Sequence, residues 1–425
     1  MNNPGEPPRD FRISDAGRSG EYDRSLERTD VYATATIAFT LRWQCENAHH
    51  GDTFVVRDFD CSSDTLHPAL NLLDKRRGHV EWHDFSNGEL LEPFQQENML
   101  EIPSDAFAKD FPKGLHVEPR HGRFYPRGIV AGTARIQAGD TRPLRVTGIT
   151  RDRIAIDLNH PLACHDLRLD AQILHIRPPP GTKRRDRPAL IEMICHNGPG
   201  MQARWQNQAT DFFSGQPFER VAAEADGDFY AMPRITGHVD RTASSQITHL
   251  YEKLLPRKGR VLDLMSSVES HLPAKQQWQV TGLGMNAEEL AANPQLCDYC
   301  VHDLNQNPDL PFADASFDAA VCSLSVEYLI RPFDVFSEVA RVLKPGAPFA
   351  LTFSNRWFPP KVIHAWQNAH DFERPAIVLE YFLRDRLFER LTTRSIRGLA
   401  RPADDHYARV LETSDPVFAV WGYKC

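Results

Sequence analysis

Residues that could hold a ligand follow an apolar run in the second half of the chain. Residues 261–264 carry Asp263 toward the end of that run, and Met265, Ser266 and Ser267 come next. In nucleotide-binding βα units a glycine-rich bend usually stands here, because backbone amides must approach the ligand closely. This chain has hydroxyl groups in place of those glycines. We therefore predict a site for a nucleotide-like ligand whose contacts differ from the usual ones.

Glycines and polar residues also end the next apolar runs. Ligands of open α/β sheets bind beyond the carboxyl ends of the strands, so we expect these residues to converge. Asp263 and Asp303 could instead cap helices or form turns, and that interpretation stays open. The expected site comprises Asp263, Met265, Ser266, Ser267, Gly284, Met285, Asn286, Asp303 and Leu304, with residues 323–327 at the fourth strand end.

A second polar cluster precedes the first helix of this region. It contains Tyr230, Arg234, His238 and Asp240. We expect this segment to cover the ligand or to contact the substrate. The alternative is a packed segment with a surface ion pair.

Alternating strands and helices must position these residues. Ile247, Leu250, Tyr251 and Leu254 have the spacing of an amphipathic helix that ends before Pro256. Short apolar strands that alternate with such helices indicate a parallel sheet covered on both faces. We expect strands over 260–264, 278–284, 298–303, 317–324 and 348–354, helices over 286–293 and 332–344, and a last strand within 415–424.

The first half of the chain shows short strands separated by turn residues, which indicates a mainly β domain. Residues 1–30 have few aliphatic side chains, so we expect a disordered tail. The Pro-rich, basic residues 178–189 are typical of a linker between domains at 31–177 and 190–425. The expected strands cover 31–43, 52–59, 79–85, 99–103, 128–136, 144–149, 153–158 and 167–176.

Residues 303–355 resemble the class I S-adenosylmethionine-dependent methyltransferases. The shared features are an acidic strand end, the run LPFADASFD, an aliphatic strand, a helix and the turn LKPGA before the next strand. The wider region 190–425 looks like a methyltransferase subfamily with a Met-Ser-Ser turn in place of the glycines. The resemblance implies a Rossmann-like α/β fold with S-adenosylmethionine as its cofactor.

The resemblance also implies roles for the site residues. Asp303 would accept the adenine amino group, and Leu304 would stack beside the adenine ring. Asp263, Met265 and Ser266 would line the methionine end of the cofactor, where serine hydroxyls would receive its carboxylate. The acid that usually binds the ribose is absent after the second strand. An Asn there lacks a charge-assisted contribution of about 1–2 kcal/mol, so we expect weak binding.

Residues 31–177 resemble the SlyD-type FKBP family, a peptidyl-prolyl isomerase domain interrupted by a small chaperone-like insert. The likeness is strongest at NHPLA, residues 159–163, and the insert would cover about 99–158. Several pocket positions depart from the family, among them Leu91, Cys164 and Leu169. We therefore expect weak or no isomerase activity, with binding of a client polypeptide retained.

Two histidines offer a weak candidate for a metal site in the first half of the chain. His79 and His83 share one face of an expected strand, because side chains repeat every two residues. A solvated polar face is the competing interpretation, and we assign no metal.

Composition excludes other classes of protein. The formal net charge is −8, whereas phosphate contacts need concentrated Lys and Arg, so we expect no nucleic-acid partner. No apolar run approaches the ~20 residues of a membrane span, so we expect a cytoplasmic protein without a membrane partner.

The leading hypothesis is a multidomain methyltransferase: a mainly β FKBP/SlyD-like module followed by an α/β Rossmann-like class I methyltransferase fold. The β module would bind peptide without catalysing isomerisation. The alternatives are a non-catalytic chaperone or metalloprotein assembly factor that retains both folds, and a weak FKBP-type prolyl isomerase.

Overall fold

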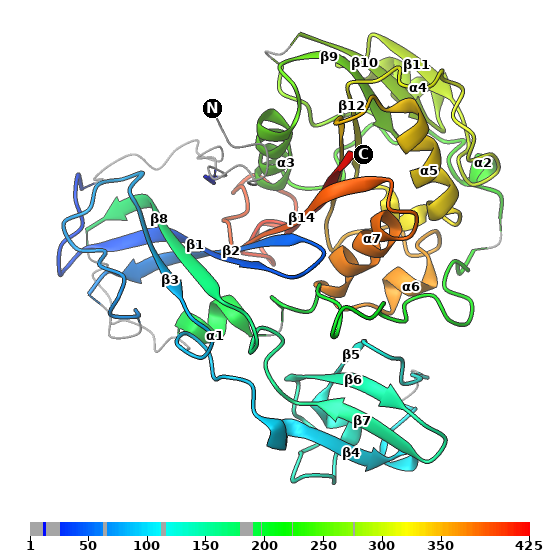
Figure 1. Ribbon diagram of the computed structural model, residues 1–425. Helices are drawn as coiled ribbons and strands as arrows, with labels where there is room; N and C mark the ends of the chain where they lie inside the picture. The colour runs from blue at the N-terminus through cyan, green and yellow to red at the C-terminus, as the bar shows by residue number, and fades with distance from the viewer. Residues whose placement is uncertain are drawn as a thin grey trace.

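The computed structural model describes residues 12–13, 26–62, 66–111, 116–178, 190–196, 198–222, 224–274 and 277–425. Its strands form one eleven-stranded sheet and one four-stranded sheet (Figure 1). Within the predicted tail, residues 26–30 are described without a gap. Thr29 is buried there, and its hydroxyl donates to the Leu72 carbonyl at 2.6 Å. Most of residues 1–25 lies outside the described part.

Parallel strands form one end of the large sheet. Their order is β11-β10-β9-β12-β13, and the antiparallel strand β15 follows, with β14 beyond it. The order runs outward in opposite directions from β9 and β12, which makes the space between these two strands the switch point of the sheet. The bounds are β9 (Lys258–Leu264), β10 (Gln277–Gly284), β11 (Asp298–Val301), β12 (Ala319–Ser323), β13 (Pro348–Phe353), β14 (Phe388–Arg397) and β15 (Val417–Lys424).

Helices cover both faces of this part of the sheet. Alternate strand residues, such as Val261 and Val321, pack with α3 (Arg241–Leu254) on one face. Their neighbours Leu262 and Ala320 pack on the other face with α5 (Pro332–Val342) and α7 (Glu373–Leu383). The predicted α/β architecture is therefore confirmed for this region. The shorter helices are α1 (Leu190–Cys195), α2 (Asp226–Phe229), α4 (Ala287–Ala292) and α6 (His364–Gln367).

The first half of the chain extends the same sheet. Strands β3 (Val80–Phe85), β8 (Leu167–Arg177), β1 (Thr34–Gln44) and β2 (His49–Asp60) pair antiparallel in that order. β2 then pairs in parallel with β14, from His49 opposite Thr392 to Phe54 opposite Arg397 (Figure 1). The mainly β character of residues 31–177 is confirmed, while their FKBP/SlyD-type identity stays a prediction.

A buried carboxylate lies at the seam between the two halves. Asp52 is 1% exposed and accepts hydrogen bonds from Trp43 Nε1 at 3.0 Å and Ser395 Oγ at 2.8 Å. The Gln202 amide donates to the same carboxylate at 3.1 Å. Three segments far apart in sequence therefore meet at one satisfied polar group.

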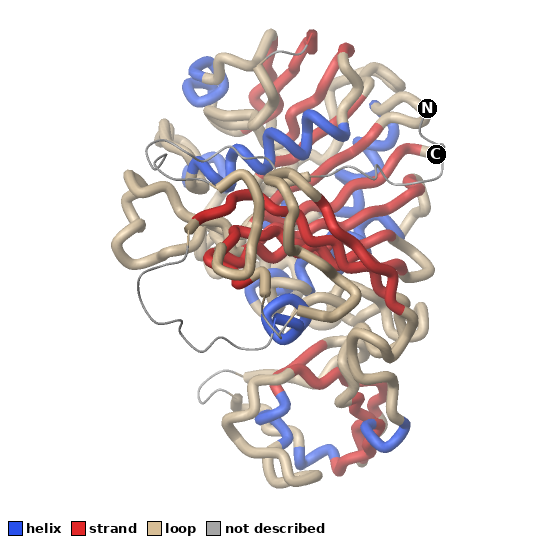
Figure 2. Tube along the Cα trace, turned by 90° about the vertical axis from the view of Figure 1, so that its left-hand side faces the viewer, coloured by secondary structure: helices blue, strands red, loops and turns tan. Residues whose placement is uncertain are grey.

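The four-stranded sheet lies apart from the large one and falls within the predicted insert (Figure 1 and Figure 2). It is antiparallel in the order β4 (Met99–Pro103), β7 (Arg153–Asp157), β6 (Pro143–Ile149) and β5 (Phe124–Pro126). Its small core includes Ile102, Leu144 and Val146.

The strand predicted over residues 128–136 is wrong. The chain forms a 3-10 helix at Arg127–Val130 and then turns, with positive φ at Gly132, Ala134 and Arg135. Left-handed residues end strand pairing, so the apolar Ile129 and Val130 are buried from a helical turn.

An ion pair fixes the small sheet to α7. Arg123 Nε donates to Glu373 Oε1 at 2.8 Å, with the Arg123 side chain 6% exposed and that of Glu373 1%. The Phe124 backbone amide donates to the same oxygen at 3.0 Å. The insert therefore contacts the α/β region through a buried charged pair and not only through its connecting strands.

Candidate functional site

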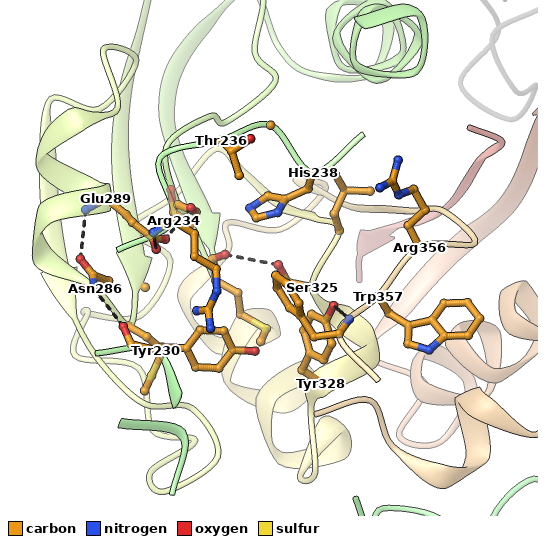
Figure 3. A pocket seen from close by; sticks show the side chains of 18 of the residues that line it. Tyr230, Arg234, Thr236, His238, Asn286, Glu289, Ser325, Tyr328, Arg356 and Trp357 are labelled. Atoms are coloured by element: carbon orange, nitrogen blue, oxygen red, sulfur yellow. Dashed lines mark hydrogen bonds between the residues drawn. The ribbon is translucent and has the colours of Figure 1, made fainter. Parts of the chain in front are cut away.

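A cavity of about 510 Å³ opens at the carboxyl ends of β9, β10 and β12, at the switch point (Figure 3). The structure brings together all the residues predicted for the cofactor and the lid except Asp263. Those that line the cavity are Tyr230, Arg234, His238, Asp240, Met265, Ser266, Ser267, Gly284, Met285, Asn286, Asp303 and Leu304.

Asp263 lies beneath the cavity and organises the turn above it. It is 1% exposed, and its Oδ2 accepts from Ser266 Oγ at 2.5 Å and from Ser270 Oγ at 2.6 Å. Burial raises the pKa of this carboxyl to about 6, although both hydroxyls oppose the shift. Asp263 thus has the turn-forming role that the sequence left open.

The Met-Ser-Ser turn is held tightly against β10. The Ser266 amide donates to the Leu283 carbonyl at 2.8 Å, and a Cβ on Gly284 would lie 2.2 Å from the Ser266 carbonyl oxygen. Only glycine fits such a close approach, so Gly284 is needed for packing of the turn. Met265 has φ of 55°, the left-handed conformation that glycine adopts easily.

The serine hydroxyls of this turn are already used as donors. Ser266 Oγ donates to Asp263, and Ser267 Oγ donates to Glu289 Oε2 at 2.6 Å. A hydroxyl has one proton, so neither serine can also donate to a ligand carboxylate in this arrangement. The expected role of these hydroxyls is therefore corrected.

Asn286 is also committed to the protein. Its Oδ1 accepts from the amides of Glu288 and Glu289, at 2.9 and 3.1 Å, and so caps α4. Its Nδ2 donates to the carbonyls of Tyr230 and Ala231, at 2.9 and 3.1 Å. Asn286 therefore joins the helix to the lid instead of offering a free amide to a ribose.

Glu289 places an acid in the cavity wall shortly after the second strand of this region. It lines the cavity, is 8% exposed, and its Oε1 accepts from the Arg234 amide at 2.7 Å. We missed Glu289 because it lies inside a helix. Its position could have been noticed in the sequence, because Glu289 stands three residues after the helix cap Asn286. The side chain of an acid at that position often points back toward the start of the helix.

Asp303 and Leu304 follow β11 at the cavity wall. Asp303 Oδ1 accepts from the amides of Asn305 and Gln306, at 2.9 and 3.2 Å, so it shapes its own turn. Leu304 is 3% exposed and presents an apolar surface there. Asn305 donates to Asp226 Oδ2 at 2.8 Å, which links this turn to the segment before the lid.

The lid cluster approaches the cavity from residues 230–240. Asp240 caps α3 by accepting from the amides of Thr242 and Ala243, at 2.8 and 3.2 Å. Burial raises the pKa of Tyr230 and lowers the pKa of His238. All four residues of the cluster line the cavity, with Asp240 acting as a helix cap, and their role as a lid stays a prediction.

Aromatic residues that we had not predicted complete the wall. Tyr328 follows β12, and its hydroxyl accepts from the Phe358 amide at 2.9 Å. Phe358 and Trp357 come from the loop after β13, and Tyr407 comes from the loop between β14 and β15. The tyrosine in SVEYL and the Trp-Phe pair in NRWFP were the available signals.

The two candidate metal-binding histidines lie elsewhere, at β3. His79 Nε2 is 2.9 Å from Glu81 Oε2, and Lys75 pairs with the same carboxylate at 3.0 Å. In the described ranges, no group of three or more His, Cys, Asp or Glu residues is arranged to hold a metal ion. Nor does any helix within those ranges have the length and apolarity to cross a bilayer.

Comparison with known families gives a partial match. Residues 267–351 match the family model Methyltransf_11, described as a methyltransferase domain. These residues run from the end of the Met-Ser-Ser turn into β13, and so include most of the cavity's β-strand ends.

Curated relatives match over short segments. The biotin biosynthesis bifunctional protein BioHC of Teredinibacter turnerae is 38% identical over 69 residues, 16% of this chain and 12% of that protein. The malonyl-[acyl-carrier protein] O-methyltransferase of Marinomonas sp. is 28% identical over 91 residues, 21% of this chain and 33% of that protein. The matches thus span at most about a third of these relatives.

Solved structures show distant likeness. The putative methyltransferase in complex with the Haloferax volcanii activator Trm112 is 19% identical, with a TM-score of 0.32, over 42% of this chain and 90% of that one. A putative methyltransferase from Bacillus halodurans is 15% identical, with a TM-score of 0.30, over 42% of this chain and 98% of that one.

The domain match bears out the methyltransferase part of the resemblance and supports S-adenosylmethionine as the cofactor. It begins at residue 267 and does not reach residues 31–177.

Proposed function

We propose that the chain is an S-adenosylmethionine-dependent methyltransferase whose cofactor binds in the cavity at the switch point. One observation carries the proposal. The strand-end residues predicted from the sequence, Asp263 excepted, line a single cavity, and most of them belong to the segment that matches a methyltransferase domain.

The chemistry suits such a cavity. Methyl transfer from a sulfonium is an in-line displacement, so holding the two reactants in line supplies most of the rate enhancement. Leu304 and Asp303 would hold the adenosine, as the resemblance implies. His238 has a lowered pKa because it is buried, so its imidazole is neutral at pH 7 and able to take a proton from an acceptor.

Residues 31–177 would present a polypeptide, as an FKBP/SlyD-like module without isomerase activity. A second cavity of about 710 Å³ supports this part of the proposal. It lies between the small sheet and the α6–α7 region, and Phe111, Phe124, Tyr125, Ile129 and Met201 give it an apolar lining. Such a surface suits an apolar peptide segment. We propose that the protein acts in the cytoplasm.

Isothermal titration with S-adenosylmethionine and S-adenosylhomocysteine tests the enzymatic part. We expect binding by the wild type and a large loss in Leu304→Arg, which would fill the adenine position. Leu411→Arg, on an exposed residue outside this cavity, is the matched control. No heat and no thermal shift at millimolar ligand would instead favour a non-catalytic chaperone or assembly factor.

The peptide-binding part needs its own measurement. Fluorescence anisotropy of a labelled unfolded polypeptide should show binding that Phe111→Asp weakens. Turnover of a proline tetrapeptide by the same protein would contradict the non-catalytic assignment of residues 31–177.

A further inference from the structure

We infer that Arg234 binds the carboxylate of the cofactor's methionine half, in place of donors that the Met-Ser-Ser turn no longer offers. The inference rests on the proposed function and adds a specific contact to it. It starts from a buried donor that has no hydrogen-bond partner among the described residues and belongs to a side chain that lines the cavity.

The turn itself has few donors left for a carboxylate. The Ser266 amide and hydroxyl donate to Leu283 and Asp263, and the Ser267 hydroxyl donates to Glu289. A carboxylate that enters a buried cavity without strong donors loses its hydration without compensation. A charged donor from another element would supply that compensation.

Arg234 has such a donor. Its Nη2 donates to the Phe229 carbonyl at 3.1 Å, whereas its Nη1 is buried and has no hydrogen-bond partner among the described residues. Within the same part of the chain no carboxylate forms an ion pair with this guanidinium. A guanidinium nitrogen buried without a hydrogen-bond partner is costly, and an oxygen of a ligand carboxylate would remove that cost.

Two other charged groups of the cavity wall differ, because each already pairs with an oppositely charged side chain. Asp226 pairs with Arg220 and Lys361, at 2.8 and 3.1 Å. Arg356 pairs with Asp415 at 3.3 Å. Of the two arginines in the described cavity wall, Arg234 is therefore the one without an ion-pair partner.

The guanidinium is held in place before any ligand arrives. It lies over the rings of Phe229, Tyr230 and Phe358, with centroid distances of 4.5, 5.6 and 5.2 Å. Figure 3 shows Arg234 reaching across the cavity from Glu289 toward Tyr230. This side chain thus offers a fixed fork of the kind that carboxylates bind well.

One carboxylate links Arg234 to the turn. Glu289 accepts from the Arg234 amide through Oε1 and from the Ser267 hydroxyl through Oε2. Glu289 therefore joins the lid segment to the Met-Ser-Ser turn. A methionine carboxylate bound near this turn would lie on the side of the cavity that the lid segment forms.

Two ligands separate this contact from the rest of cofactor binding. S-adenosylhomocysteine carries the amino-acid carboxylate, whereas 5′-methylthioadenosine has the same adenosine and sulfur without it. By titration calorimetry, Arg234→Gln should lose roughly 10–100-fold in affinity for S-adenosylhomocysteine, the usual range for a charged hydrogen bond. Its affinity for 5′-methylthioadenosine should stay within about threefold of the wild type, which also shows that the cavity is folded.

Arg234→Lys should give an intermediate loss, because it keeps the charge without the fork. The matched control is Arg397→Gln. Arg397 has buried, unpartnered nitrogens among the described residues and lies over Phe372 at 4.5 Å, but it is outside the cavity. That variant should bind both ligands as the wild type does.

The possible failures differ in meaning. Equal affinity of Arg234→Gln and wild type for S-adenosylhomocysteine, or an equal loss for both ligands, overturns the assignment of Arg234 alone. No binding of either ligand by the wild type overturns the proposed function, and the inference with it.

Discussion

Two residues at the switch point adopt backbone conformations that suit glycine. Met265 and Leu324 directly follow the neighbouring strands β9 and β12, and both have φ of 55°. Each such residue costs on the order of 1 kcal/mol, and a fold keeps such strain where function requires the geometry. The turn therefore lacks glycine residues but keeps the left-handed backbone conformation that glycine would adopt.

Comparing Met265→Gly with Met265→Ala isolates that backbone cost. Both changes remove the side chain, but only alanine keeps the Cβ that disfavours the left-handed conformation. We expect Met265→Gly to be the more stable of the two by about 1 kcal/mol in urea unfolding. It should also bind S-adenosylhomocysteine at least as tightly as the wild type. Equal stability of the two variants would show that the turn is relaxed.

A buried carboxyl follows β12 beside the cavity wall. Glu327 is fully buried, and neither of its carboxyl oxygens has a hydrogen-bond partner among the described residues. Burial raises the pKa of Glu327 to about 8, and the nearby Arg374 opposes this only in part. The side chain is therefore protonated in the folded protein at neutral pH.

This carboxyl makes stability depend on pH in a defined direction. The unfolded chain loses the proton near pH 4.5 and the folded chain near pH 8, so the stabilising contribution is lost as pH rises between these values. Glu327→Gln should remove that dependence and raise stability at pH 8 by roughly 2–5 kcal/mol relative to the wild type. Denaturant unfolding at pH 5, 6.5 and 8 measures it. Glu288→Gln, an exposed change on α4, should leave the profile as it is.

For single residues, the sequence predicts which side chains come together at the site better than it predicts what each of them does there. The expected site residues converge because parallel strands end at one edge, which spacing alone determines. Their roles depend on which neighbour each polar group meets. Asn286 and Ser267 look like ligand contacts in the sequence, but Glu289 and the lid backbone engage them first.

Among the elements, β14 was not expected from the sequence. Its residues Thr393, Arg394 and Ser395 are buried, although a buried strand usually shows an apolar run. They are buried because β14 lies between β15 and β2, and side chains from the first half of the chain satisfy them, as Asp52 does for Ser395. Polar burial of this kind needs a distant partner, which local periodicity cannot reveal.

The contact between the small sheet and α7 allows a direct test. Arg123→Ala would leave Glu373 buried without its counter-ion, so we expect a loss of roughly 3–5 kcal/mol in the free energy of unfolding. Arg142→Ala removes a pair with Asp140 in the same small sheet region; the Arg142 side chain is 58% exposed, so the change should cost less than about 1 kcal/mol. Similar costs for the two variants would show that the buried pair contributes little to attachment of the insert.

At the scale of the whole molecule, the two halves share one sheet. Backbone groups of residues 392–397 pair with β2, so residues 190–425 alone would expose an unpaired strand edge. We expect that fragment to associate or precipitate, and to elute as larger species than the full chain does in size-exclusion chromatography. A monomeric fragment with an unchanged melting temperature would show that the seam is dispensable.

The shared sheet also has a consequence for how the chain is synthesised. His50 in β2 hydrogen-bonds to Thr393 in β14, and 343 positions separate them. At ~5–20 residues per second, a ribosome needs on the order of 20–70 s to cover that distance. During that time β2 has emerged and its edge is unpaired, which is the state in which strands recruit other chains. The nascent protein is therefore most exposed to aggregation in the interval before β14 leaves the ribosome.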